Sequence, residues 1–138
     1  MDRNDFQKLA QMRFDEAKVL RDNGRFDGAY YLAGYSVECA LKACIARRTR
    51  PEEFPPKWQV VRGYYTHDIN TLLKAAELED ERNVKARNDS TFQSNWSIVA
   101  QWNEDARYQF HTRPTAEELI DAIEDPSHGV LPWLQSFW

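Results

Sequence analysis

The residues of this chain that are best suited to chemistry lie between Trp102 and His111. If this stretch is helical, at about 100° per residue, Arg107 and His111 share one face. Asn103 and Glu104 then lie beside them. An arginine is always charged and can hold phosphate oxygens by two hydrogen bonds, and an imidazole titrates near neutral pH and can move a proton. The spacing therefore indicates phosphate chemistry.

The same residues also have a purely structural interpretation. Glu104 and Arg107 stand at i and i+3, so they can form a surface ion pair, which is common in proteins and contributes little to stability. His111 would then be a solvated residue near a helix C-terminus, where the helix dipole favours its protonated form. Spacing alone leaves both interpretations open.

Two further charged positions lie upstream. Glu38 and Lys42 stand at i and i+4 in a stretch that is otherwise almost wholly apolar, so they can neutralise each other on one helix face. A buried charge is costly without a partner, so this pair implies a second helix, a second subunit or a ligand. His67, followed by Asp68, could be a ligand or a base at a helix start, although capping and packing explain it as well.

Several classes of site have no signature in the sequence. No His or carboxylate set has the spacing of metal ligands, and no glycine-rich phosphate loop or nucleophile motif occurs. We therefore expect neither a metal site nor another cofactor. The net charge of −4 does not favour non-specific binding to nucleic acid.

Cysteine usage and hydropathy indicate a cytoplasmic protein. Cys39 and Cys44 have the spacing of neither a zinc site nor a redox motif, and we expect packed thiols in a reducing compartment. The polar start Met1–Asp5 lacks the pattern of a secretion signal. The apolar stretch around Glu38 and Lys42 is nearly as long as a membrane span, but these two charges near its centre would be costly in lipid.

The elements that must position these residues are helices. Apolar residues recur every three or four positions, which predicts an all-α fold, an up-and-down bundle of four to five helices in one domain over residues 1–138. The first helix is expected from Asp5 to about Asp22 and ends at Asn23-Gly24. The second runs from about Phe26 to Arg48 and is antiparallel to the first, because the connection is short.

The rest of the chain is expected to alternate loops and helices. Residues 49–65 are rich in proline and form a loop, with an extended piece at 58–61. A third helix starts near Thr66 or Asp68, and a charged loop follows from Glu79 to Asp89.

A fourth helix is expected to begin at a Ser90 cap and to continue through Phe110 toward His111. Pro114 then interrupts the chain, and Thr115 with Glu118 forms a capping box for a fifth helix. The apolar end, residues 129–138, docks against the bundle.

The run AYYLAGYSVECALKA at residues 29–43 resembles the second-helix signature of HEPN domains (higher eukaryote and prokaryote nucleotide-binding). The resemblance covers nearly the whole chain. It continues at Thr66–Ile69 with Leu72 and Leu73, at Trp102 with Arg107 and Tyr108, and at Gly129–Leu131 with Trp133 and Trp138.

This resemblance implies a helical bundle that usually dimerises. Many HEPN proteins are metal-independent ribonucleases, often toxins of toxin–antitoxin or phage-defence systems. Others bind nucleotides or partner proteins, commonly a small nucleotidyltransferase encoded nearby. The ribonuclease motif of the family is an Arg, four to six residues that begin with a polar one, and a His, with two copies facing each other across the dimer. Only Arg107 and His111 match by position, and three residues that begin with Tyr108 separate them.

Two functions therefore stand for this chain. In the first, it is a dimeric module of a toxin–antitoxin or defence-type system that binds a nucleotide or a nucleotidyltransferase partner. Its binding residues are Asn103, Glu104, Tyr108 and Lys42, and the Glu38–Lys42 pair is a link inside the bundle or beside the dimer seam.

In the second function, it is a ribonuclease that leaves a 2′,3′-cyclic phosphate. A 2′-hydroxyl of the RNA attacks the adjacent phosphate, with His111 as general acid or base. Arg107 stabilises the added negative charge.

Overall fold

The computed structural model describes residues 1–48 and 66–138 of the chain, and these residues are helical with no strand, which confirms the all-α class. The predicted loop at 49–65, with its extended piece at 58–61, lies outside the described residues.

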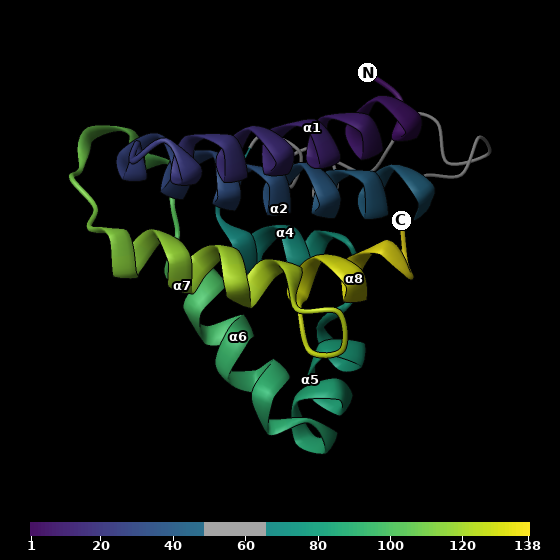
Figure 1. Ribbon diagram of the computed structural model, residues 1–138. Coiled ribbons are helices and arrows are strands. Elements are labelled where there is room, and N and C mark those ends of the chain that lie inside the picture. The colour runs from purple at the N-terminus through teal and green to yellow at the C-terminus, as the bar shows by residue number, and fades with distance from the viewer. Residues whose placement is uncertain (49–65) are drawn as a thin grey trace.

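Two long helices pack side by side along the upper edge of the molecule in Figure 1: α1 (Arg3–Asp22) and α2 (Phe26–Arg48). A capping box between Asp2 and Asp5 starts α1. Gly24 follows its last turn with φ of +74°, a conformation that glycine adopts without strain. This tight turn makes the two helices antiparallel, as the short connection predicts.

α2 is the central helix because other elements cover it on several sides. It packs against α1, α4 (Ile69–Ala75), α7 (Arg113–Glu124), α8 (Val130–Gln135) and the 3₁₀ segment η2 (Glu104–Tyr108). An α-helix that is surrounded in this way must be apolar on more than one face. Its buried residues confirm this: Ala29, Ala33, Gly34, Ser36, Val37, Glu38, Cys39, Ala40, Leu41, Ala43, Cys44 and Ile45.

A second layer lies beneath the long pair. In Figure 1, α7 and α8 run side by side with α2, and α5 (Glu79–Asn88) and α6 (Ser90–Ala100) project away from α1. The side chains of Val130, Leu131 and Leu134 in α8 are buried. The prediction that the apolar end docks against the bundle is therefore confirmed.

The prediction of a loop over Glu79–Asp89 is wrong, because this segment forms α5. It buries none of its residues, so it shows no apolar stripe. Its helix rests on local preferences: acidic residues fill the first turn and basic residues the last, which suits the helix dipole.

The fourth helix is shorter than predicted. α6 ends at Ala100, η2 forms a separate turn, and the chain at Gln109 is extended. The physical reason is Trp102, which is buried against Gly34 of α2, so closely that a Cβ at residue 34 would lie 2.2 Å from the indole. The helix must break for Trp102 to reach this contact. Arg107 and His111 therefore do not share a face of one helix.

The start of the fifth helix also differs from the prediction. Thr112 caps α7 by accepting the Thr115 N–H, and Pro114 lies in the first turn, where its missing N–H costs nothing. The predicted capping box from Thr115 to Glu118 therefore does not start this helix. Of the helices in residues 1–48 and 66–138, none is both long and apolar enough to cross a membrane.

Candidate functional site

Four charged side chains and the imidazole of His67 form a continuous series where α2, the residues before α4 and η2 meet. Oε1 of Glu38 accepts a hydrogen bond from Lys42 Nζ at 2.9 Å and lies 2.7 Å from Nδ1 of His67. The other ring nitrogen of His67 lies 3.2 Å from Oε2 of Glu104. The same Glu104 oxygen is 3.9 Å from Nη2 of Arg107. We call these five residues the charged cluster.

Local structure places each member of the charged cluster. Glu38 and Lys42 stand one turn apart on α2. The Asp68 carboxylate accepts the Thr71 N–H and so starts α4, which fixes the preceding His67 opposite Glu38. Glu104 opens η2.

The buried carboxylate of Glu38 anchors the cluster. Its side chain is 1% exposed, and Oε2 has no hydrogen-bond partner among the described residues. A buried carboxylate must be neutralised or paired, and Lys42 and His67 both approach its other oxygen. The Glu38 side chain therefore holds the side chains of Lys42 and His67 against the core of the bundle.

The imidazole of His67 lies between two carboxylates and has the arrangement of a general base when Glu104 moves away from Nε2. A carboxylate behind one ring nitrogen sets the tautomer and orientation of the ring, as in hydrolase triads. Here Glu38 takes that place at Nδ1, and Nε2 faces Glu104. The side chains of His67 and Glu104 are 43% and 45% exposed, so a ligand can reach this part of the cluster.

Arg107 lies at the exposed end of the cluster. Its Nε donates to the backbone carbonyl of Glu104 at 3.3 Å, and its guanidinium lies 5.3 Å from the centre of the Tyr108 ring. Its side chain is 46% exposed, which leaves N–H groups available to a phosphate.

His111 lies apart from Arg107. Its backbone N–H donates to the Asp27 carboxylate, and its ring stacks on Tyr30 with centroids 3.8 Å apart. Nε2 is buried and has no hydrogen-bond partner among the described residues. No hydrogen bond, ion pair or ring contact within the described part of the chain joins His111 to Arg107.

The other predicted binding residues have different surroundings. Asn103 caps η2, because its side chain accepts the Asp105 N–H at 2.9 Å. Tyr108 is 78% exposed. Glu104 and Lys42 belong to the charged cluster.

The sequence indicates Glu38 and His67 only as separate positions. They are 29 residues apart, and their contact depends on how α4 packs against α2. The available signal is the buried position of Glu38 itself, since a carboxylate in an apolar helix must find a partner from another element.

The described residues hold no group of three or more His, Cys, Asp or Glu side chains that could bind a metal ion. Burial raises the pKa of the Cys39 thiol to about 11 and that of Cys44 to about 12. Both thiols are therefore protonated at neutral pH and unsuited to nucleophilic chemistry.

The family model of the HEPN domain matches residues 5–126 of the chain. The protein therefore belongs to the HEPN domain family, whose members are helical modules of nucleotide-binding and ribonuclease type that commonly dimerise. No curated protein and no solved structure matches the chain significantly.

Proposed function

We propose that this protein is a HEPN module that binds the phosphate of a nucleotide or of RNA at the charged cluster. The observation that carries the proposal is the continuous series from buried Glu38 to half-exposed Arg107. Lys42, His67 and Arg107 supply hydrogen-bond donors along this series, and such donors bind phosphate oxygens well.

Glu104 stands where the ligand anion would bind. Its carboxylate lies within ion-pair distance of both His67 and Arg107. A phosphate makes the same kinds of hydrogen bonds with these two side chains, so it would replace the Glu104 carboxylate. The half-exposed side chain of Glu104 can move aside without a change in the core.

The test is equilibrium binding of a uridine nucleotide and of a short oligouridylate, measured by calorimetry. We expect Arg107→Ala to weaken both, and the matched variant Arg87→Ala, at an exposed position on α5, to bind as the wild type does. Absence of binding to the wild-type protein, or equal loss in both variants, would contradict the proposal.

A second candidate function is metal-independent cleavage of RNA. The observation that favours it is the imidazole of His67 held by the buried Glu38 carboxylate. With Glu104 moved away from it, Nε2 of His67 would take the proton of a 2′-hydroxyl as the oxygen of that hydroxyl attacks the adjacent phosphorus. The bond to the 5′ oxygen then breaks, this oxygen takes a proton from water, and Arg107 stabilises the negative charge. The products are a 2′,3′-cyclic phosphate and a 5′-hydroxyl.

RNA cleavage in EDTA separates the two candidates. For a ribonuclease with this geometry, His67→Gln should abolish cleavage and His111→Gln should preserve most of it. If His111→Gln abolishes cleavage and His67→Gln preserves most of it, the general acid or base is His111 and not His67. No cleavage by the wild-type protein would leave binding as the function.

The assembly of the protein belongs to the same proposal. We expect a homodimer whose two clusters face one groove, acting with a nucleotidyltransferase in a toxin–antitoxin or defence-type system. Membership of the HEPN family supports the dimer. Light scattering tests the dimer, and co-purification with the product of a neighbouring gene tests the partner.

A further inference from the structure

The segment that follows Arg107 exposes two aromatic side chains to solvent. Phe110 is 95% exposed and Tyr108 is 78% exposed, more than any other large hydrophobic side chain that the structure describes. Exposed apolar surface that is concentrated in one place commonly marks a binding surface. Here the two rings flank Gln109, and Tyr108 directly follows Arg107 at the exposed end of the charged cluster.

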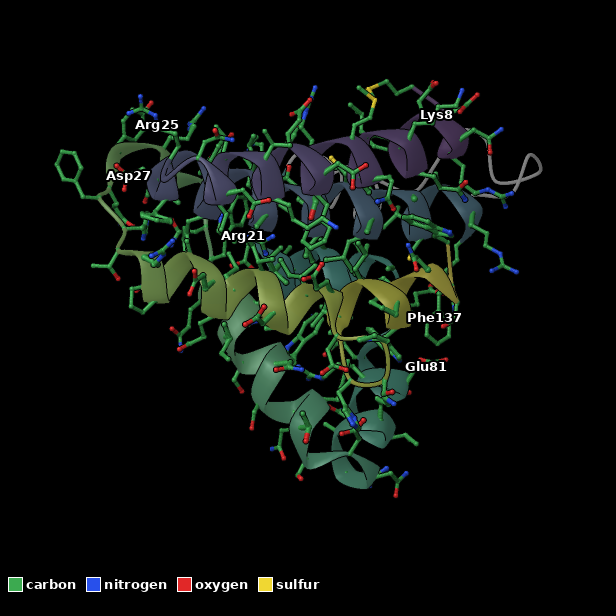
Figure 2. The ribbon with its side chains drawn as sticks, viewed as in Figure 1. Lys8, Arg21, Arg25, Asp27, Glu81 and Phe137 are labelled. Carbon is green, nitrogen blue, oxygen red and sulfur yellow. The ribbon has the colours of Figure 1, made fainter. Side chains whose placement is uncertain are left out.

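These two rings are displayed by an anchored segment. On one side, Gln109 donates its N–H to the carbonyl of buried Ala106. On the other, His111 bonds to Asp27 and stacks on Tyr30 of α2. Figure 2 labels Asp27 at the end of the molecule where this loop passes the α1–α2 turn. An anchored backbone loses little conformational freedom when it binds, so the positions of residues 108 and 110 are set before a ligand arrives.

The backbone keeps the two aromatic residues close together. Gln109, which lies between them, has extended dihedral angles, φ −117° and ψ 154°. Residues two apart on an extended chain are roughly 6.6 Å apart. This separation suits flat rings that stack on, or between, the side chains of Tyr108 and Phe110.

The local cation Arg107 and the small apolar area favour a nucleic acid over a second copy of the chain. The Arg107 guanidinium lies 5.3 Å from the centre of the Tyr108 ring, so a cation accompanies the exposed rings. Two aromatic side chains offer roughly 300–500 Å², whereas a stable protein interface needs about 800 Å² on each partner. Gln109, between the two rings, and Thr112 and Arg113, which follow them, are polar and exposed. The apolar surface of the two rings therefore does not continue along the chain.

We propose that Tyr108 and Phe110 form a stacking platform for the bases of single-stranded RNA. This inference rests on the proposed function, because the charged cluster holds the phosphate of the same strand. Stacking on aromatic side chains accepts every base, so the platform gives affinity for unpaired RNA with little sequence preference. Paired bases are already stacked in a duplex and would not bind in this way.

The test compares a labelled oligouridylate with an abasic oligoribonucleotide of the same length by fluorescence anisotropy. The variant Tyr108→Leu/Phe110→Leu keeps apolar side chains and removes the rings. We expect it to bind the oligouridylate roughly 5- to 100-fold more weakly than the wild type does. Its affinity for the abasic strand should not change. Met12→Ala, at another exposed apolar position, should bind both strands as the wild type does.

Several results would overturn the platform. Unchanged binding of the oligouridylate by the double variant would do so, and so would an equal loss for the abasic strand. A double variant that is monomeric where the wild type is dimeric would assign the rings to a subunit interface instead. If the wild type binds neither strand, the proposed function fails as well. If Arg107→Ala weakens both strands and the double variant weakens neither, only the platform fails.

Discussion

At the scale of single residues, the site depends on one buried carboxylate. Glu38 is almost fully buried, and its partners come from its own helix and from the residue before the Asp68 cap of α4. The sequence predicts the Glu38–Lys42 pair from its i, i+4 spacing, but it cannot predict the contact with His67 because no local rule joins distant residues. Arg107 and His111 show the opposite case, because they are close in the sequence but do not contact each other in the structure.

Removal of Lys42 should destabilise the fold. In Lys42→Met, the buried Glu38 carboxylate keeps only His67 as a partner, and the free energy of unfolding should fall by about 3 kcal/mol. Urea unfolding measures this change. Glu38→Gln combined with Lys42→Met removes both charges and should recover part of the loss. If the single variant is as stable as the wild type, the pair is not buried as described.

Replacement of Glu104 should strengthen binding of phosphate. Glu104→Gln removes a negative charge between His67 and Arg107, and the affinity for an oligouridylate should rise roughly 2- to 5-fold, as expected for half-exposed charges. Calorimetry at low salt measures the effect. Glu117→Gln, at a carboxylate paired with Arg113 on α7, is the matched control and should change little. Weaker binding by Glu104→Gln would show that this carboxylate contacts the ligand favourably.

At the scale of elements, most of the long helices could be predicted from the sequence, because apolar periodicity reports burial directly. Apolar periodicity does not predict the helices correctly at two places, and each has a physical reason. α5 buries none of its residues, so no stripe reveals it, and α6 ends early because Trp102 packs against Gly34. That second failure decides the site, because it removes Arg107 and His111 from a common helix face.

Two glycines of α2 should therefore respond in opposite ways to alanine. In Gly34→Ala the new methyl group collides with the Trp102 ring, so unfolding should become easier by more than about 2 kcal/mol. In Gly28→Ala the nearest atom is a flexible Leu20 methyl at 3.1 Å, and the better helix former should make that variant neutral or slightly more stable. Urea unfolding followed by tryptophan fluorescence compares the two. Equal stability of the two variants would contradict the close packing of Trp102 on α2.

Asp89, which caps the start of α6, should make the free energy of unfolding fall as the pH becomes acidic. A hydrogen bond from His128 and one from the Phe92 N–H hold the pKa of the Asp89 carboxyl well below its usual range. The pKa of this carboxyl is lower in the folded state than in the unfolded state, where it is about 3.9. The resulting stabilisation is therefore fully present above the unfolded-state pKa and is lost as the pH falls toward the folded-state pKa. Urea midpoints between neutral pH and acid should therefore decline, and Asp89→Asn should be less stable at neutral pH with a smaller decline in acid. An identical decline in that variant would contradict this role.

At the scale of the whole molecule, α2 links the fold to the proposed function. It packs against helices of both layers and supplies Glu38 and Lys42 to the charged cluster. The HEPN resemblance of this helix predicts the family, which the match over residues 5–126 establishes. The chemistry could not be predicted as fully, because the cluster assembles from three segments that only the packed bundle brings together.

The most direct test of the account follows the side chains of the charged cluster by NMR while an oligouridylate is added. We expect the ring resonances of His67 and the guanidinium resonance of Arg107 to shift and saturate together. The ring resonances of His128, which pairs with Asp89 at the start of α6, should remain in place. Saturable shifts at His128 with none at His67 or Arg107 would contradict the central claim that the charged cluster binds the phosphate of RNA.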